Sequence, residues 1–195
     1  PLSFGISPQM LQFGLGFAGI ACCIAMSMPQ VHIVTYCVGL GYGPVAGAEM
    51  LSLMLFGGVI SRIIFGLLSD RLGGVRTLLL GSAMQTLGLA FYLPYDGLVS
   101  LYTVSLIFGL SQGGIVPSYA LIVREYMPAK EAGARVGFVL MMTIWVMALC
   151  GWMSGWIYDL SGGYQMAFLI GVLLNLLNIG IIVALFFRKR PARGT

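Results

Sequence analysis

Residues 45–68 read VAGAEMLSLMLFGGVISRIIFGLL, and residues 69–76 continue with the polar segment SDRLGGVR. The apolar residues of the first part form one block, instead of recurring with the period of an amphipathic helix or strand. A helix of about 20 such residues crosses the roughly 30 Å hydrocarbon core of a bilayer. The segment therefore predicts a transmembrane helix that is followed by a charged turn at the membrane surface.

The same pattern recurs on both sides of this segment. Apolar blocks of similar length cover residues 9–36, 77–93, 98–123, 133–158 and 164–187. Hydrophobic residues make up 59% of the chain and charged residues 8%, whereas about a quarter of a soluble domain is charged. Alternating segments of about ten residues, which would indicate a transmembrane barrel, are absent from the sequence. The sequence predicts an all-α integral membrane protein with six transmembrane helices.

The charges divide between the two membrane surfaces that this topology defines. All ten Lys and Arg residues fall at or toward one side, whereas Asp96 and Asp159 mark the loops of the opposite side. The positive-inside rule then places both termini and the loops at 69–76 and 124–132 in the cytoplasm. This topology accounts for the net charge of +4, so we expect no nucleic-acid partner.

The four cysteines give no indication of a metal or redox site. Cys22, Cys23, Cys37 and Cys150 form no Cys-x-x-Cys pair, and three of them lie within apolar blocks. We interpret them as small buried hydrophobic residues and expect neither a metal nor a cofactor.

Three segments resemble those of a known transporter family. Residues 66–76, GLLSDRLGGVR, resemble the Gly-x-x-x-Asp-Arg-x-Gly-x-x-Arg loop of the major facilitator superfamily. Residues 124–137, REYMPAKEAGARVG, and 155–164, GWIYDLSGGY, are most similar to its branch of monocarboxylate transporters and oxalate–formate antiporters. The resemblance implies one half of a twelve-helix fold, built as a three-plus-three repeat.

The resemblance also implies a function. It predicts a secondary active transporter that moves a small organic anion, such as a monocarboxylate, by alternating access in symport or antiport, with protons as candidate coupling ions. The expected location is a bacterial inner (plasma) membrane. A drug or metabolite efflux carrier of the same superfamily, a channel and a membrane assembly subunit remain alternatives. An enzyme is not expected, because the spans lack a nucleophile paired with a base.

The glycine-rich fourth block indicates which half of the transporter this is. Gly109, Gly113 and Gly114 have no Arg before them in the block, and the fifth block, through Gly151 and Gly155, has no Gly-Pro pair. The N-terminal half of the family carries both features. We therefore expect residues 1–195 to be the C-terminal half, whose partner is a missing N-terminal half of the same chain.

Arg62 is the candidate substrate-binding residue. It lies inside the apolar block at 45–68, where an Arg costs at least about 2.5–3.5 kcal/mol at mid-membrane and is by default functional. Gly58 and Gly66, one turn away on either side, leave this face of the helix bare. The resemblance implies that Arg62 binds the substrate carboxylate; the alternative is an Arg that snorkels to the surface. The fifth block lacks the Lys of the oxalate exchanger, which argues against a dianion held between two cations of this half.

Three further polar or aromatic residues are candidates for the transport pathway. Gln112 in the fourth block and Trp145 in the fifth are predicted to line the substrate cavity. His32 follows Pro29, which we expect to kink the first helix. This histidine is a candidate for proton coupling, or for a hydrogen bond within a helix interface.

The motif at residues 66–76 is the candidate conformational latch. In the resembled family, residues that correspond to Gly66, Asp70, Arg71, Gly73 and Arg76 contact helix ends of the other half and hold the outward-facing state. The alternative is that Asp70 is a solvated turn residue just past the helix end.

Two polar pairs are assigned structural roles. Asn175 and Asn178 are expected to form interhelical hydrogen bonds. Glu131 and Arg135, four residues apart at the start of the fifth helix, should form a surface ion pair.

Overall fold

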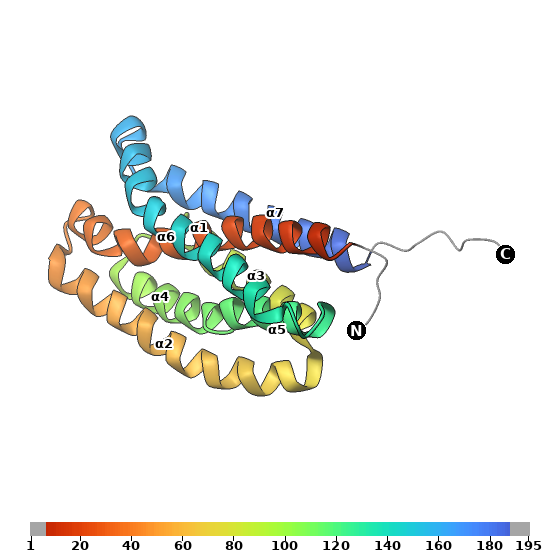
Figure 1. The fold of residues 1–195 in the computed structure, drawn as a ribbon. Coiled ribbons are helices and arrows are strands. Elements are labelled where there is room, and N and C mark those ends of the chain that lie inside the picture. Colours follow the sequence, from red (N-terminus) through yellow and green to blue (C-terminus); the bar gives the residue numbers. More distant parts are fainter. Residues whose placement is uncertain (1–6, 188–195) are drawn as a thin grey trace.

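The computed structural model describes residues 7–187, which fold into a bundle of α-helices (Figure 1). The helices are α1 (Pro8–Gly39), α2 (Gly43–Leu72), α3 (Gly74–Phe91), α4 (Leu98–Gln112), α5 (Ile115–Tyr126), α6 (Ala132–Ser161) and α7 (Gln165–Phe187). No strand occurs in this range. The predicted all-α membrane fold is confirmed.

Five segments of the described chain are long and apolar enough to cross a membrane: α1, α2, the stretch Leu98–Tyr126 that joins α4 and α5, α6 and α7. The helix α3 is not among these five segments. It has 18 residues, which include the polar Arg76 and Gln85. It packs against α4, α5 and α7. A helix with neighbours on several sides needs less apolar surface than one that faces lipid.

The fourth predicted helix is interrupted, contrary to the expectation of one continuous helix over 98–123. α4 ends at Gln112 and α5 begins at Ile115, with Gly113 and Gly114 between them. Pro117 explains the break, because it has no N–H to donate to the Gly113 carbonyl and its ring crowds that carbonyl. Two successive glycines also weaken a helix.

The expected polar loop at 69–76 is almost entirely helical. α2 continues to Leu72, so Asp70 and Arg71 lie in its last turn and not beyond its end. Gly73 alone separates α2 from α3, and its N–H donates to the Ser69 carbonyl at 2.9 Å. Its φ of 78° lies in the left-handed region, which glycine adopts without steric cost. One glycine therefore makes the whole turn.

Most Lys and Arg residues of the described range gather at one end of the bundle; the four at 188–193 lie outside the described residues. The start of α1, the α2–α3 junction, the α5–α6 junction and the end of α7 all lie there (Figure 1). The α2–α3 junction brings Arg71 and Arg76 to this end, and the α5–α6 junction brings Arg124 and Lys130. We call it the charged end. For these described residues, the relative placement of the charges agrees with the expectation from the sequence.

A buried network of hydrogen bonds joins α3, α5 and α7. The Asn175 side-chain amide donates to the Ser82 carbonyl at 2.9 Å and to the Thr86 hydroxyl at 3.0 Å. Asn178 donates to the Ser82 hydroxyl at 2.9 Å and accepts from the Tyr119 hydroxyl at 2.7 Å. Polar groups without water must be satisfied within the protein. The predicted interhelical role of both asparagines is confirmed.

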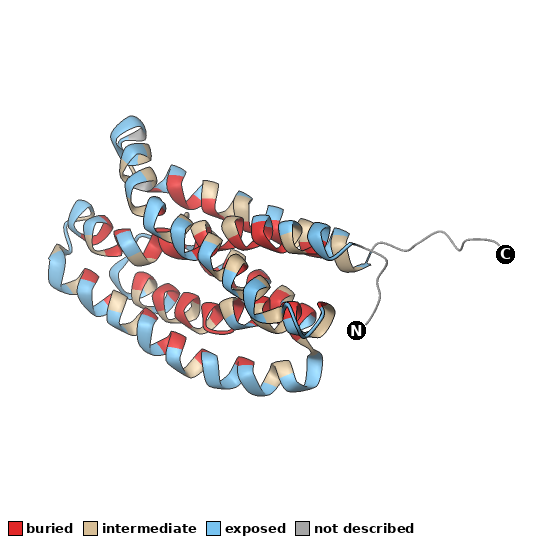
Figure 2. Cartoon of the chain, in the orientation of Figure 1, coloured by how far each residue is buried: buried red, intermediate tan, exposed pale blue. Residues whose placement is uncertain are grey.

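The helices α2 and α6 are the least covered. Only 22% of the membrane-crossing window of α2 and 17% of that of α6 is buried, against 61% for α1 (Figure 2). Large apolar side chains cover these open faces, among them Phe56, Val59 and Ile63 on α2 and Trp145 and Trp152 on α6. In a membrane protein, such surfaces face lipid or further helices.

Glycines bring α2 close to the α4–α5 break. A Cβ at Gly113 would lie 2.4 Å from the Gly58 carbonyl oxygen and 2.7 Å from the Arg62 amide nitrogen. A Cβ at Gly114 would lie 2.2 Å from the Phe65 Cβ. Small residues permit such backbone contact between membrane helices.

We predict that Gly113→Ala destabilises the protein by about 1–3 kcal/mol, because backbone atoms of α2 occupy the space that the new methyl group needs. The melting temperature of the purified protein in detergent measures the loss. Gly66→Ala is the matched control, since nothing lies within 4 Å of a Cβ at that position. Equal melting temperatures for the two variants would show that the helices do not meet at Gly113.

Candidate functional site

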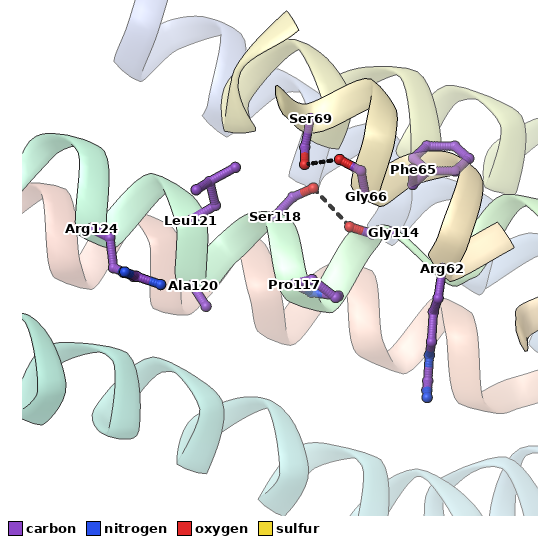
Figure 3. Close-up of a pocket in the computed structure, with 10 residues that line it drawn as sticks. All are labelled: Arg62, Phe65, Gly66, Ser69, Gly114, Pro117, Ser118, Ala120, Leu121 and Arg124. Atoms are coloured by element: carbon purple, nitrogen blue, oxygen red, sulfur yellow. Dashed lines mark hydrogen bonds between the residues drawn. The ribbon is translucent and has the colours of Figure 1, made fainter. Parts of the chain in front are cut away.

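A cavity of about 240 Å³ lies between α2 and α5, near the charged end (Figure 3). Its lining consists of Arg62, Phe65, Gly66, Ser69, Gly114, Pro117, Ser118, Ala120, Leu121 and Arg124. The predicted substrate residue Arg62 is therefore part of a cavity wall. The volume is below the roughly 300–1,000 Å³ of pockets for drug-sized ligands, so it suits a small molecule.

The guanidinium of Arg62 is open to a ligand. The side chain is exposed and extends away from its own helix (Figure 3). Within residues 7–187 it forms neither a hydrogen bond nor an ion pair, while its backbone is fixed against Gly113. The structure thus holds the base of this side chain and leaves its charged end unpaired.

The two glycines that flank Arg62 differ in role, in part contrary to expectation. Gly66 is exposed, and nothing lies within 4 Å of the position that a Cβ would take there, so it does leave space beside Arg62. Gly58 is buried, and a Cβ there would lie 3.7 Å from the Gln112 side-chain nitrogen. Its face is therefore not bare, because α4 packs against it with this amide.

Gln112 lies close to Gly58, one helical turn before Arg62 in α2. It is buried, and its side-chain oxygen accepts a 2.7 Å hydrogen bond from the side chain of Gln30 in α1. Gln30 was not a candidate from the sequence. The available signal was an amide side chain directly after Pro29, within a predominantly apolar helix. The two amides provide donors and acceptors beside the Arg62 turn.

Arg124 is a second cation in the same cavity. The sequence placed it in a polar loop at 124–132, but it lies in the last turn of α5 and lines the cavity with Arg62. It forms no ion pair with any residue that the structure describes. The argument from the sequence against a dianion held between two cations of this half considered only the predicted fifth helix at 133–158, which is α6. Arg124 lies on α5.

The structure does not bring Trp145 or His32 to this cavity. Trp145 is 66% exposed on α6 and does not contribute to the lining. His32 is buried, with its ring centre 5.1 Å from that of Tyr164, which lies in the α6–α7 turn. This places His32 toward the end opposite to the charged end. The roles assigned to both residues stay predictions.

The candidate latch residues lie at the charged end. Asp70, Arg71 and Arg76 are exposed there, beyond the end of the cavity lining on α2. Their neighbour Gly74 donates its N–H to the two carboxylate oxygens of Glu125 at 3.2 and 3.4 Å.

Glu125 holds the α2–α3 junction from α5, although sequence reasoning did not single it out. A carboxylate at the N-terminus of a helix is stabilised by the unpaired N–H groups and the helix dipole. The contact joins residues 51 positions apart in the chain. A local sequence pattern could not have indicated it.

Comparison with known proteins identifies the family. The model of the Major Facilitator Superfamily matches residues 15–195, and the chain belongs to this superfamily. Its curated relatives place the similarity in the monocarboxylate-transporter branch.

The individual relatives are distant in sequence. Monocarboxylate transporter 13 of Rattus norvegicus is 24% identical over 160 residues, which cover 81% of this chain and 37% of the relative. Monocarboxylate transporter 10 of Danio rerio is 28% identical over 167 residues, 81% of this chain and 32% of the relative. A crystal structure of a POT peptide transporter in complex with sulfate superimposes with a TM-score of 0.77 at 20% identity, over 89% of this chain and 37% of that one. The chain thus spans less than two fifths of the length of these proteins and has the fold of a fragment of a major facilitator transporter.

We predict that Glu125→Ala lowers the free energy of unfolding by about 0.5–2 kcal/mol, since it removes the acceptor at the start of α3. Glu125→Gln, which keeps an oxygen acceptor, should lose less. Thermal unfolding of the purified protein measures both.

Glu131→Ala is the control for this comparison. Glu131 forms an ion pair with Arg135, at 2.8 Å from its Nε, on the protein surface. Such a pair contributes only about 0.2–0.5 kcal/mol. If Glu125→Ala is no more destabilising than Glu131→Ala, the capping contact does not hold the junction.

Proposed function

We propose that this chain is the C-terminal six-helix half of a carrier that moves a small organic anion, such as a monocarboxylate, by alternating access. The observation that carries the proposal is the position of Arg62. This arginine belongs to a membrane helix, lines a small cavity and has no counter-charge among the described residues. A membrane-embedded cation needs a compensating partner. An anionic substrate supplies that partner, and the names of the relatives agree with this class of substrate.

The residues around the cavity suit a carboxylate. The planar guanidinium of Arg62 can donate two parallel hydrogen bonds to its two oxygens. The amides of Gln30 and Gln112 are near the same turn and can hydrogen-bond polar groups elsewhere on the substrate. Trp145, on the open face of α6, is proposed to complete the pathway from the other side, and His32 to carry a coupled proton.

The remaining partners follow from the open faces of the bundle. We propose that the exposed faces of α2 and α6 face the N-terminal half and the lipid bilayer. The latch residues Gly66, Asp70, Arg71, Gly73 and Arg76 would contact the cytoplasmic helix ends of that half. The charged end is assigned to the cytoplasm by the positive-inside rule, in a bacterial inner membrane.

The proposed orientation predicts which positions react with a membrane-impermeant thiol reagent. In a background without the native cysteines, Asp96→Cys and Asp159→Cys should be labelled from outside the cell, because both residues are exposed at the end opposite to the charged end. Arg76→Cys should be labelled only after the membrane is opened. If only Arg76→Cys is labelled in intact cells, the protein has the orientation opposite to the one proposed.

The proposed role of Arg62 predicts a graded loss of transport. In the complete transporter reconstituted in liposomes, Arg62→Lys should weaken uptake of formate, lactate or pyruvate, because an ammonium cannot reproduce bidentate binding. Arg62→Gln should nearly abolish uptake. The loss of one charged hydrogen-bond pair costs about 1.5–3 kcal/mol, or roughly 10- to 150-fold in affinity.

Lys130→Gln is the control, since Lys130 is an exposed cation that does not line the cavity and does not belong to the candidate latch. It should leave the affinity unchanged. If Arg62→Gln retains the affinity of the unmodified transporter at equal expression, Arg62 does not bind the anion.

A further inference from the structure

The cavity at Arg62 contains two cations and no acid. Arg62 and Arg124 contribute to its lining, and the other residues of the wall are uncharged (Figure 3). Neither arginine forms an ion pair within the described part of the chain. Two uncompensated positive charges on the wall of one small cavity attract an anion more strongly than either would alone, particularly where apolar walls focus the field.

Acids close to Arg124 are directed elsewhere. Its neighbour in sequence, Glu125, accepts the Gly74 N–H at the start of α3. Asp70, in the last turn of α2, is exposed and does not line the cavity. Elsewhere this chain does pair an arginine, since Arg135 binds Glu131 and the Gln12 side chain. Among the described residues, no acid therefore offsets the charge of Arg124 at the cavity.

The two serine hydroxyl groups of the cavity donate within their own helices, so the arginines are its principal anion-binding groups. Ser69 donates its proton to the Gly66 carbonyl and Ser118 to the Gly114 carbonyl, each at 2.7 Å (Figure 3). Both serine protons are therefore already used within their own helices. The remaining lining around Arg124 is apolar and includes Pro117, Ala120 and Leu121.

The two arginines are too far apart to hold one small carboxylate together. The backbone of Arg62 contacts Gly113, and Arg124, in the last turn of α5, lies eleven residues further along the chain. At 1.5 Å per residue, the backbones that carry the two side chains are about 16 Å apart, and the two guanidinium groups lie at opposite ends of the lining (Figure 3). The geometry therefore supports two successive positions for the anion and not one shared site.

We propose that Arg124 is a second anion-binding position, which captures the substrate carboxylate at the charged end and exchanges it with Arg62. This inference rests on the proposed function, because it assumes that Arg62 binds the transported anion. In this proposal, the anion moves through the cavity between Arg62 and the charged end. Arg124 then governs access from that end only.

The test measures transport from each side separately. The complete transporter is reconstituted in liposomes with known orientation, and radiolabelled formate, lactate or pyruvate is supplied at the charged end or at the opposite end. Arg124→Gln should raise the KM from the charged end by roughly tenfold, the lower limit of electrostatic steering effects. The KM from the opposite end and the maximal rate from the charged end should stay within twofold. The maximal rate from the opposite end should fall by the same factor by which the KM from the charged end rises, because Vmax/KM must be equal in the two directions at equal driving force.

Lys130→Gln is the matched control, since Lys130 is exposed at the same end and does not line the cavity. It should leave both KM values unchanged. Should Arg124→Gln fold poorly, the unmodified transporter gives a second readout, because added salt screens the cavity charge. Salt should then raise the KM from the charged end more than that from the opposite end.

The outcomes separate this inference from the proposed function. If Arg124→Gln, or salt in its place, changes the KM equally from the two sides or not at all while Arg62→Gln abolishes uptake, Arg124 is a solvated surface charge and the second position is refuted. If Arg62→Gln also retains normal uptake, or none of the three anions is transported, the proposed function fails and the inference fails with it.

Discussion

The close contact between α2 and the glycines at the α4–α5 break positions the other features of the cavity. Gly113 and Gly114 allow the backbone of α2 to touch the adjacent chain, where any Cβ would collide with Gly58, Arg62 or Phe65. Pro117 opens the helix at the same place, because it leaves the Gly113 carbonyl without its usual donor. The break shifts the start of α5, and the space between α5 and α2 is the cavity that Arg62 lines.

In the part of the chain that the structure describes, polar side chains are paired on one side of the bundle and lack ion-pair partners on the other. Between α3, α5 and α7, every side-chain amide and hydroxyl of the Asn175–Asn178–Tyr119 network has a partner, as a medium without water demands. The side of the bundle formed by α2 and α5 carries two arginines without ion-pair partners among the described residues. A protein tolerates such groups where they face water, a ligand or another part of the protein. The contrast identifies the first region as structural and the second as the candidate for transport.

The sequence predicted those features that depend on local composition. Apolar block length indicated the helices, charge counts indicated which ends lie together, and Asn175 and Asn178 stood out because amides are costly in an apolar helix. The α4–α5 break was missed, although Pro117 and two glycines marked it. Arg124, Gln30 and Glu125 were missed for a different reason. Their significance depends on neighbours in other helices, at 51 residues for Glu125 and 82 for Gln30.

The short helix α5 couples the structural region to the cavity. Tyr119, Ile122 and Val123 are fully buried in the core on one side of it. Pro117, Leu121 and Arg124, spaced by four and three residues, form the side that lines the cavity. Glu125 reaches the start of α3 from the same last turn. Because twelve residues serve all three contacts, a displacement of α5 would alter the cavity and the α2–α3 junction together. Any movement that opens the cavity toward the charged end must therefore either carry α3 with α5 or break the Glu125 contact.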